Sequence, residues 1–171
     1  MKNDYPEMLN IKGSVIDWKP IRGNAPYVEE YEITINVKGI IGKGPVYRDK
    51  HVVKLVLPAN YPNAAPDARL VTTPFIYHPN WYPDGKWCCG NPWNNAEGLG
   101  EFVVRMVKTI QYDLHITNET SPANSDANAW YISKKQSGLF PCDHTRLPDP
   151  TGSRFKPQMT VKKKFDIKDR H

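Results

Sequence analysis

The 171-residue sequence has no apolar run close to the roughly 20 residues that a membrane-spanning helix needs. Its first ten residues, MKNDYPEMLN, contain neither an apolar stretch nor a small-residue cleavage site, so we expect no secretory leader and a cytoplasmic location. Cysteine is scarce, with three residues and no Cys-x-x-Cys spacing. An odd number of cysteines in a reducing compartment argues against a disulfide framework. The thiols are therefore expected to be reactive or buried.

Two of the cysteines, Cys88 and Cys89, are adjacent in the stretch YHPNWYPDGKWCCGNPW. Vicinal cysteines make poor zinc ligands, because zinc takes tetrahedral donors and its cysteine ligands usually have about two to four residues between them. His78 and His144 would have to complete such a site, so we predict no metal and no cofactor. A vicinal disulfide would be strained and reducible, although it would protect a reactive thiol reversibly. Cys89 is otherwise a small buried residue or a substitute nucleophile.

The net charge of +5 is concentrated near the C-terminus. Residues 139–171 contain eight Lys/Arg and four Asp/Glu, which gives +4 of the total. Phosphate binding usually requires a broader basic stripe with aromatic platforms. We therefore favour a solvated tail, or a tail docked on a partner or on the domain, over a nucleic-acid-binding segment.

Hydrophobic periodicity predicts four sequential strands, at residues 10–17, 30–38, 51–58 and 67–73. Strict alternation makes residues 30–38 a half-buried strand. The stretches KPIRGNAP and GIIGKGP between strands are rich in Gly and Pro, as hairpin connections should be. Four consecutive strands indicate an antiparallel meander.

Two helices are predicted after the double cysteine. Apolar residues at i, i+3, i+4 and i+7 indicate an amphipathic helix over residues 99–114. A shorter helix is expected from Ser125 as N-cap, with Ala127, Trp130 and Tyr131 turned inward. These patterns predict an α+β domain, residues 1–138, with helices on one face of the sheet, followed by a basic, proline-containing extension, residues 139–171.

Three short motifs follow one another between the third strand and the first of these helices. They comprise Tyr61, Pro62, Pro66, His78, Pro79, Asn80, Gly85 and Cys88. A Tyr-Pro-x-x-x-Pro turn, His-Pro-Asn and a cysteine, in this order and spacing, resemble the ubiquitin-conjugating (UBC) enzymes. The resemblance extends over about residues 11–136 and takes in Trp93 and both helices. It implies a UBC-like fold.

The resemblance further implies that Cys88 accepts the C-terminus of a ubiquitin-like protein as a thioester from an adenylating activating enzyme, and passes it to an amine of a target protein. A thiol of pKa about 8.5 is only a few per cent thiolate at neutral pH, yet sulfur exchanges thioesters without a dedicated base. The family assigns Asn80 to oxyanion stabilisation or to holding the active-site loop. His78 is implied to be a hydrogen-bonded loop anchor.

Attack by lysine is the harder step, because its amine is protonated at pH 7 and must be desolvated or placed beside an acceptor. Family members often carry an Asp or Ser that orients this amine, and Ser121, before Pro122, matches that position. Asp113, Glu119 and Asp126 compete for the role. Carboxylates in such loops are more often solvated or capping groups.

The chain also departs from the family pattern. The segment MKNDYPEMLN is too short for the usual first helix and contains Pro6, so this helix is expected to be short or missing and its contact with the activating enzyme is in doubt. Cys89 replaces an apolar residue. Bacterial relatives in antiviral operons depart similarly, so we expect a bacterial enzyme whose target is a defence protein.

Two other interpretations stay open. The chain would be an inactive UBC-fold binding or scaffold module if no activating enzyme loads Cys88. The aromatic residues Trp81, Tyr82, Trp87 and Trp93 would suit base stacking, but only Lys86 is basic among them. We prefer a lid packed around the active-site loop.

Overall fold

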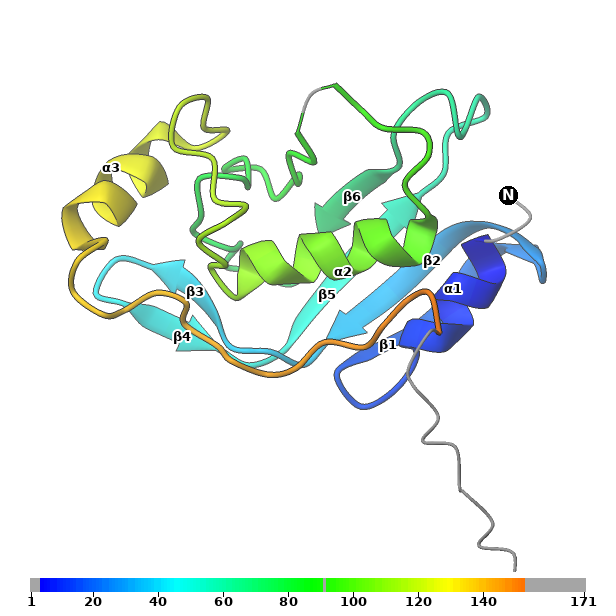
Figure 1. Cartoon of the computed structure of the whole chain (residues 1–171), viewed down its shortest axis with the longest axis horizontal. Coiled ribbons are helices and arrows are strands. Elements are labelled where there is room, and N and C mark those ends of the chain that lie inside the picture. Colours follow the sequence, from blue (N-terminus) through cyan, green and yellow to red (C-terminus); the bar gives the residue numbers. More distant parts are fainter. Residues whose placement is uncertain (1–3, 91, 153–171) are drawn as a thin grey trace, which may run out of the picture.

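An antiparallel sheet with a long helix across it forms the centre of the computed structural model, which describes residues 4–90 and 92–152 (Figure 1). The elements are α1 (Asp4–Ile11), β1 (Ile16–Asn24), β2 (Tyr27–Ile35), β3 (Gly39–Gly42), β4 (Val46–Arg48), β5 (His51–Val56), β6 (Asp67–Leu70), α2 (Leu99–Ile110) and α3 (Ser125–Lys134). The main sheet has the order β1-β2-β5-β6 and every pairing is antiparallel. The predicted α+β class, four-stranded sheet and short first helix are confirmed, and the architecture is consistent with a UBC-like fold.

The strand predicted from strict alternation lies in the middle of the sheet as β2. Its side chains Ile33 and Ile35 are fully buried in the same core as the apolar face of α2. Ile33 pairs with Trp18 of β1 and with Val53 of β5. A slip of one residue would turn these side chains to solvent, so burial fixes the register.

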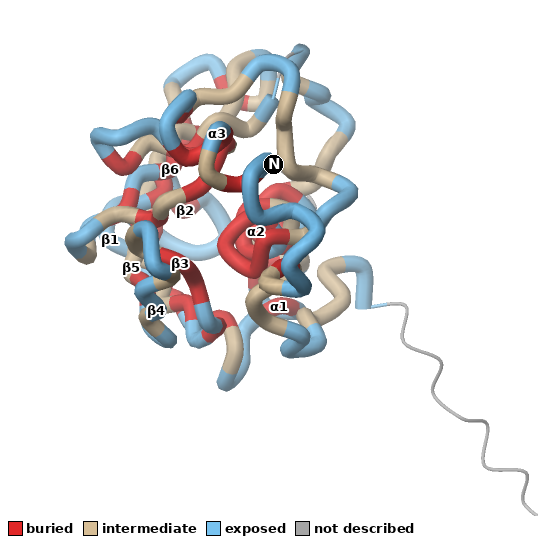
Figure 2. Tube along the Cα trace, turned by 90° about the vertical axis from the view of Figure 1, so that its left-hand side faces the viewer, coloured by how far each residue is buried: buried red, intermediate tan, exposed pale blue. Residues whose placement is uncertain are grey.

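Helix α2 supplies the other half of this core, and Figure 2 shows it buried along most of its length. The fully buried side chains of its apolar face are Leu99, Phe102, Val103, Met106, Val107 and Ile110. The predicted helix over residues 99–114 was too long. The helix ends at Ile110 because Tyr112 adopts the left-handed conformation, with φ +60°, and donates its hydroxyl to Tyr77 O at 2.8 Å. Leu114 lies beyond the helix and is 47% exposed.

The first predicted strand, over residues 10–17, was wrong in position. Residues 10 and 11 end α1, whereas β1 begins at Ile16 and continues to Asn24, so only Ala25 and Pro26 of the predicted connection KPIRGNAP form the hairpin turn. From Lys19 to the end of this edge strand every residue is exposed. Its outer half therefore lacks the alternation by which strands are predicted.

Two other predictions need correction. The stretch GIIGKGP, predicted as a plain connection, contains β3, which pairs with β4 in a separate two-stranded sheet. The N-cap of α3 is Asn124 instead of Ser125, because the Asn124 side chain accepts the backbone N–H of Ala127 at 3.0 Å. Ala127 and Tyr131 are buried as predicted, and Trp130 is half-buried.

Helix α1 packs against the start of α2 (Figure 1). Pro6 lies in its first turn, where a missing N–H removes no helical hydrogen bond. The carboxylates of Asp4 and Glu7 accept the backbone N–H groups of Leu99 and Gly100 at 3.3 and 3.0 Å. The two acids therefore satisfy donors that α2 cannot pair itself and lie at the favourable end of its dipole.

Residues 139–152 run from α3 along α2 to α1, as the orange segment of Figure 1. Phe140 is buried, Cys142 N donates to Gln111 O at 2.9 Å, and Asn10 Nδ2 donates to Pro150 O at 2.8 Å. This part of the extension docks on the domain. The rest of the predicted basic tail, residues 153–171, lies outside the described residues.

Candidate active site

Cys88 lies on the segment that leads from β6 to α2, and main-chain hydrogen bonds fix it there. The preceding residue, Trp87, donates its N–H to Ala68 O of β6 at 2.9 Å, and Cys88 N donates to Asn80 O at 2.8 Å. Cys88 is half-buried and its thiol is free. The predicted nucleophile therefore sits beside the predicted His-Pro-Asn motif.

A tight turn before Cys88 requires glycine. Gly85 has φ +86°, and a Cβ added there would lie 2.8 Å from the Phe75 ring. Its N–H donates to Tyr82 O and its carbonyl accepts Leu70 N, each at 2.9 Å. The turn thereby returns the chain to the edge of β6 just ahead of the cysteine.

His78 is fully buried and both ring nitrogens have partners. Nδ1 accepts the N–H of Asn80 at 2.9 Å, and Nε2 lies 3.4 Å from Thr117 Oγ1, whose own hydroxyl donates to Asp113 O. The ring packs against Tyr112 in a tilted arrangement, with the ring centroids 4.1 Å apart. Burial lowers the pKa of His78 to about 3, so the ring is neutral at pH 7. These contacts are those of a loop anchor.

Asn80 joins the Cys88 segment to the loop between α2 and α3. Its Nδ2 donates to Ile116 O at 3.1 Å, and its Oδ1 accepts the N–H of Asn118 at 2.9 Å. Pro79 O adds a further link by accepting Ala123 N at 2.7 Å. His-Pro-Asn therefore fastens this loop beside the segment that carries Cys88.

Ser121 is exposed on this same loop, and the Asn118 side chain holds the main chain of Ser121 by two hydrogen bonds. Asn118 Oδ1 accepts the N–H of Ser121 at 3.0 Å, while Nδ2 donates to Ser121 O at 2.8 Å. Asn118 also contacts Asn80, so it connects the two predicted site residues. Asn118 was not predicted from the sequence, although an Asn three residues before Ser-Pro is a typical turn former.

The three competing carboxylates already have partners. Asp113 accepts the N–H of His115 at 2.9 Å. Glu119 pairs with Lys135. Asp126 pairs with Lys43 at 3.0 Å and accepts the Tyr77 hydroxyl at 2.8 Å, and these contacts hold its pKa below the ordinary value. Ser121 stays a prediction as the residue that orients an amine.

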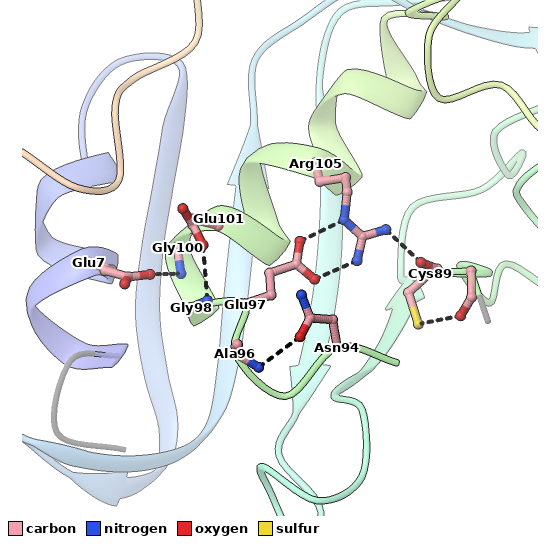
Figure 3. A network of polar contacts seen from close by, with 10 residues as sticks. Glu7, Cys89, Asn94, Ala96, Glu97, Gly98, Gly100, Glu101 and Arg105 are labelled. Atoms are coloured by element: carbon pink, nitrogen blue, oxygen red, sulfur yellow. Dashed lines mark hydrogen bonds and ion pairs between the residues drawn. The ribbon is translucent and has the colours of Figure 1, made fainter. Parts of the chain in front are cut away.

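Cys89 is half-buried, with its sulfur 3.7 Å from the carbonyl oxygen of Gly90 (Figure 3). Desolvation raises the pKa of the Cys89 thiol, against a smaller opposing effect of the Arg105 charge. A raised pKa lowers the thiolate fraction, which makes Cys89 a poorer nucleophile at neutral pH. Its carbonyl accepts a hydrogen bond from Arg105 at 2.5 Å.

Arg105 of α2 and Glu97 before that helix were also missed from the sequence. Arg105 lies between buried residues of an amphipathic helix, and its partner is eight positions away, beyond the usual i, i+4 spacing. No local sequence pattern indicates that Arg105 of this pair donates a hydrogen bond to the main chain of Cys89.

The predicted aromatic lid is mainly part of the core. Trp81 and Trp87 are buried, and Trp81 Nε1 donates to Thr109 Oγ1 at 2.9 Å. Trp93 Nε1 donates to Pro62 O at 2.8 Å, and Tyr82 is 41% exposed. Trp81 and Trp87 therefore pack inside the protein, whereas Trp93 is half-buried with its ring centroid 5.5 Å from that of Phe102.

Within residues 4–90 and 92–152 no group of three or more His, Cys, Asp or Glu side chains is arranged to hold a metal ion. No helix in this described part of the chain has the length and apolar character required to cross a membrane.

No protein-family model matches the sequence. A segment of 89 residues is 32% identical to the ubiquitin-conjugating enzyme E2 of African swine fever virus (strain Badajoz 1971 Vero-adapted). The match covers 46% of this chain and 39% of the viral protein, so the chain spans well under half the length of this relative. The α+β fold and this similarity support a ubiquitin-conjugating-like family.

Proposed function

We propose that this chain is a ubiquitin-conjugating-type acyltransferase, which carries a ubiquitin-like protein as a thioester on Cys88 and transfers it to an amine of a target protein. The observation that carries the proposal is the link between Cys88 and the loop of Ser121. Asn80 O accepts the N–H of Cys88, and the Asn80 side chain bonds to Ile116 and Asn118. A half-buried free thiol is thereby placed beside a fixed polar loop.

The first proposed step exchanges one thioester for another. The Cys88 thiolate attacks the carbonyl carbon that joins the modifier to a cysteine of the activating enzyme. A new C–S bond forms, the old one breaks, and the activating enzyme's cysteine leaves as a thiolate. Since one thiolate replaces another, the exchange requires no dedicated general base.

The second proposed step is attack by a neutral amine on the Cys88 thioester. An amide bond forms, Cys88 leaves as a thiolate, and the ammonium proton passes to water or to a nearby acceptor. Ser121 would orient the amine. Because the Nδ2 of Asn80 already donates to Ile116 O, the hydrogen bonds favour loop holding as the first role of Asn80.

The proposed partners are a ubiquitin-like protein, an adenylating activating enzyme and a target protein. Helix α1 has eight residues, and Asp4 and Glu7 are occupied at the start of α2, so the activating enzyme would need a contact other than the family's long first helix. These departures and Cys89 also underlie our proposal of a bacterial defence role. A reducing cytoplasm would keep Cys88 a free thiol.

Intact mass spectrometry tests this function. The tagged protein is purified without reductant from the organism that encodes it, together with Cys88→Ser and Cys89→Ser variants, and weighed before and after thiol treatment. We expect a protein-sized adduct that thiol removes from wild type and from Cys89→Ser. In Cys88→Ser the adduct becomes thiol-resistant, because an oxyester replaces the thioester. A thiol-resistant adduct only in Cys89→Ser would move the role to Cys89.

A binding or scaffold module is the second candidate, and the short α1 favours it because the family's docking helix is reduced. This module would retain a modifier without any covalent adduct, even when an activating enzyme and ATP are present. Cys88→Ala separates the two functions. Conjugation is expected to stop in this variant while its unfolding midpoint stays close to that of wild type, whereas a scaffold would be indifferent to the change.

A further inference from the structure

Arg105 is the only described residue of α2 whose side chain donates a hydrogen bond to the double-cysteine segment (Figure 3). Its Nη1 donates to the carbonyl oxygen of Cys89 at 2.5 Å. Its Nε and Nη2 donate to the two carboxylate oxygens of Glu97 at 2.6 and 2.7 Å. One guanidinium therefore joins α2, the segment before α2, and the residue that follows Cys88.

The same guanidinium lies over the ring of Trp87, on the other side of Cys88. The Arg105 Cζ atom lies 5.0 Å from the ring centroid of Trp87 and 5.7 Å from that of Phe102. Trp87 precedes Cys88 and Cys89 follows it. Arg105 thus contacts both chain neighbours of the proposed nucleophile.

The environment makes this contact stronger than that of a surface ion pair. The side chain of Arg105 is 31% exposed and that of Glu97 is 14% exposed, so solvent screens the pair only in part. The Glu97 carboxylate accepts two hydrogen bonds from the planar guanidinium, and a third N–H group of the guanidinium donates to the Cys89 carbonyl. A lysine ammonium lacks this planar fork and the delocalised charge that lies over the Trp87 ring.

We propose that Arg105, oriented by Glu97, is a positioning residue for Cys88. It fixes the Cys89 carbonyl and the Trp87 ring, so that the main chain at Cys88 keeps one conformation when the thiol meets an acyl carbonyl. It does not touch the reacting atoms. The inference rests on the proposed function only in taking Cys88 as the acyl carrier.

Acyl exchange with a defined probe tests the inference without an activating enzyme. The probe is the C-terminal thioester of ubiquitin with 2-mercaptoethanesulfonate, which transfers its acyl group to a cysteine and releases the small thiolate. All proteins carry Cys89→Ser. The remaining thiol, Cys142, donates to the carbonyls of Lys38 and Ile110, and burial raises its pKa to about 12, so it reacts slowly.

Arg105→Met is expected to slow acylation of Cys88 about tenfold, since small displacements of a reacting group have large effects on rate. Alkylation of Cys88 by iodoacetamide requires less orientation and should change less than about threefold. Arg105→Lys should recover part of the acylation rate, and the rate of Glu97→Gln should lie between that of the Cys89→Ser parent and that of Arg105→Met. Lys108→Met removes an exposed cation from the same helix and serves as the matched control. Equal losses in acylation and alkylation, or none in either, would overturn the inference.

Amide hydrogen exchange gives a second reading that does not depend on acyl transfer. The N–H of Cys88 is bonded to Asn80 O, and its protection should fall at least about tenfold in Arg105→Met and less in Arg105→Lys. If the Cys89→Ser parent accepts no acyl group on Cys88, the proposed function fails, while the exchange of the Cys88 amide still decides the positioning role. Unchanged protection of Cys88 in Arg105→Met would overturn that role.

Discussion

Nδ1 of the buried His78 ring accepts the backbone N–H of Asn80 at 2.9 Å. The ring proton is therefore assigned to Nε2, which faces Thr117 Oγ1. Because burial lowers the pKa of His78 to about 3, the ring stays neutral through the physiological range and is poorly matched to proton transfer at pH 7. By accepting this N–H, the His78 ring holds the conformation of the tripeptide His78-Pro79-Asn80.

Folding stability is expected to fall as the pH is lowered from about 7 to about 5. Burial lowers the pKa of His78 to about 3 and that of His51 to about 4, whereas both have the ordinary value of 6.5 in the unfolded chain. Below pH 6.5 the unfolded state binds more protons, so the free energy of unfolding decreases toward acid. Each histidine contributes on the order of 2 kcal/mol over this interval.

Urea unfolding at several pH values measures this slope. His51→Gln and His78→Gln should each reduce it, and His115→Gln, which changes an exposed ring, is the matched control. A slope that neither buried variant alters would assign the pH dependence to other groups.

Asn80→Ala is expected to slow amine transfer from a loaded Cys88 more than it slows loading. The variant loses the bonds to Ile116 O and Asn118 N, which hold the loop of Ser121. Loss of an oxyanion donor typically costs about a hundredfold or more in rate, whereas a loosened loop costs less. Single-turnover transfer to free lysine, measured apart from loading, gives both rates.

Asn118→Ala is the matched variant, because it loosens the Ser121 main chain while the Asn80 side chain remains. If both variants reduce transfer equally, Asn80 acts by holding the loop. A much larger loss in Asn80→Ala would assign it an oxyanion role. Equal losses of loading and transfer would indicate that the segment around Cys88 has collapsed.

The sequence predicted those parts of the fold in which burial imposes a period. Alternation in β2 and the apolar face of α2 are clear because one side of each element is buried. The outer half of β1 has no buried face, so its position was wrong. The end of α2 depends on the left-handed Tyr112, a tertiary effect that periodicity does not reveal.

The residues of the candidate site also fall into a group that the sequence predicts and a group that it does not. Cys88, Asn80 and His78 belong to short motifs, so they could be named from their order and spacing. Arg105 and Asn118 act through carbonyl and amide groups of distant segments, and no spacing rule connects an arginine on a helix with the carbonyl of Cys89. Main-chain partners of this kind are visible only in the folded chain.

Ser121→Ala is expected to slow transfer to lysine by a factor of about three to ten, with loading unchanged. The hydroxyl is exposed on a loop that Asn118 holds, and we propose that it orients the amine without removing its proton. Ser121→Asp should equal or exceed wild type, since a carboxylate also accepts a proton. Asp126→Asn is the comparison, because Asp126 is already paired with Lys43 and Tyr77. If Asp126→Asn has the larger effect, the orienting group is on α3.

A chain that ends at residue 138 is expected to be markedly less stable than one that ends at residue 152. The longer chain keeps Phe140, which is 8% exposed and lies 4.5 and 4.9 Å from the ring centroids of Tyr112 and Tyr131. Loss of a buried phenylalanine typically costs about 3 to 5 kcal/mol, a large part of the stability of a small domain. Urea unfolding followed by tryptophan fluorescence compares both chains with Phe140→Ala in the full protein.

The same comparison tests the proposed boundary at residue 138. If both shortened chains match the full protein, residues 139–152 are an appendage and the boundary stands. If Phe140→Ala alone reproduces most of the loss, the folded unit extends into the docked segment. Tyr112 packs against His78, so loosening of the Phe140 contact should also loosen the His78-Pro79-Asn80 tripeptide. Acyl transfer by the chain ending at 138 is then expected to fall further than its folded fraction, because the support of Asn80 weakens before the domain unfolds.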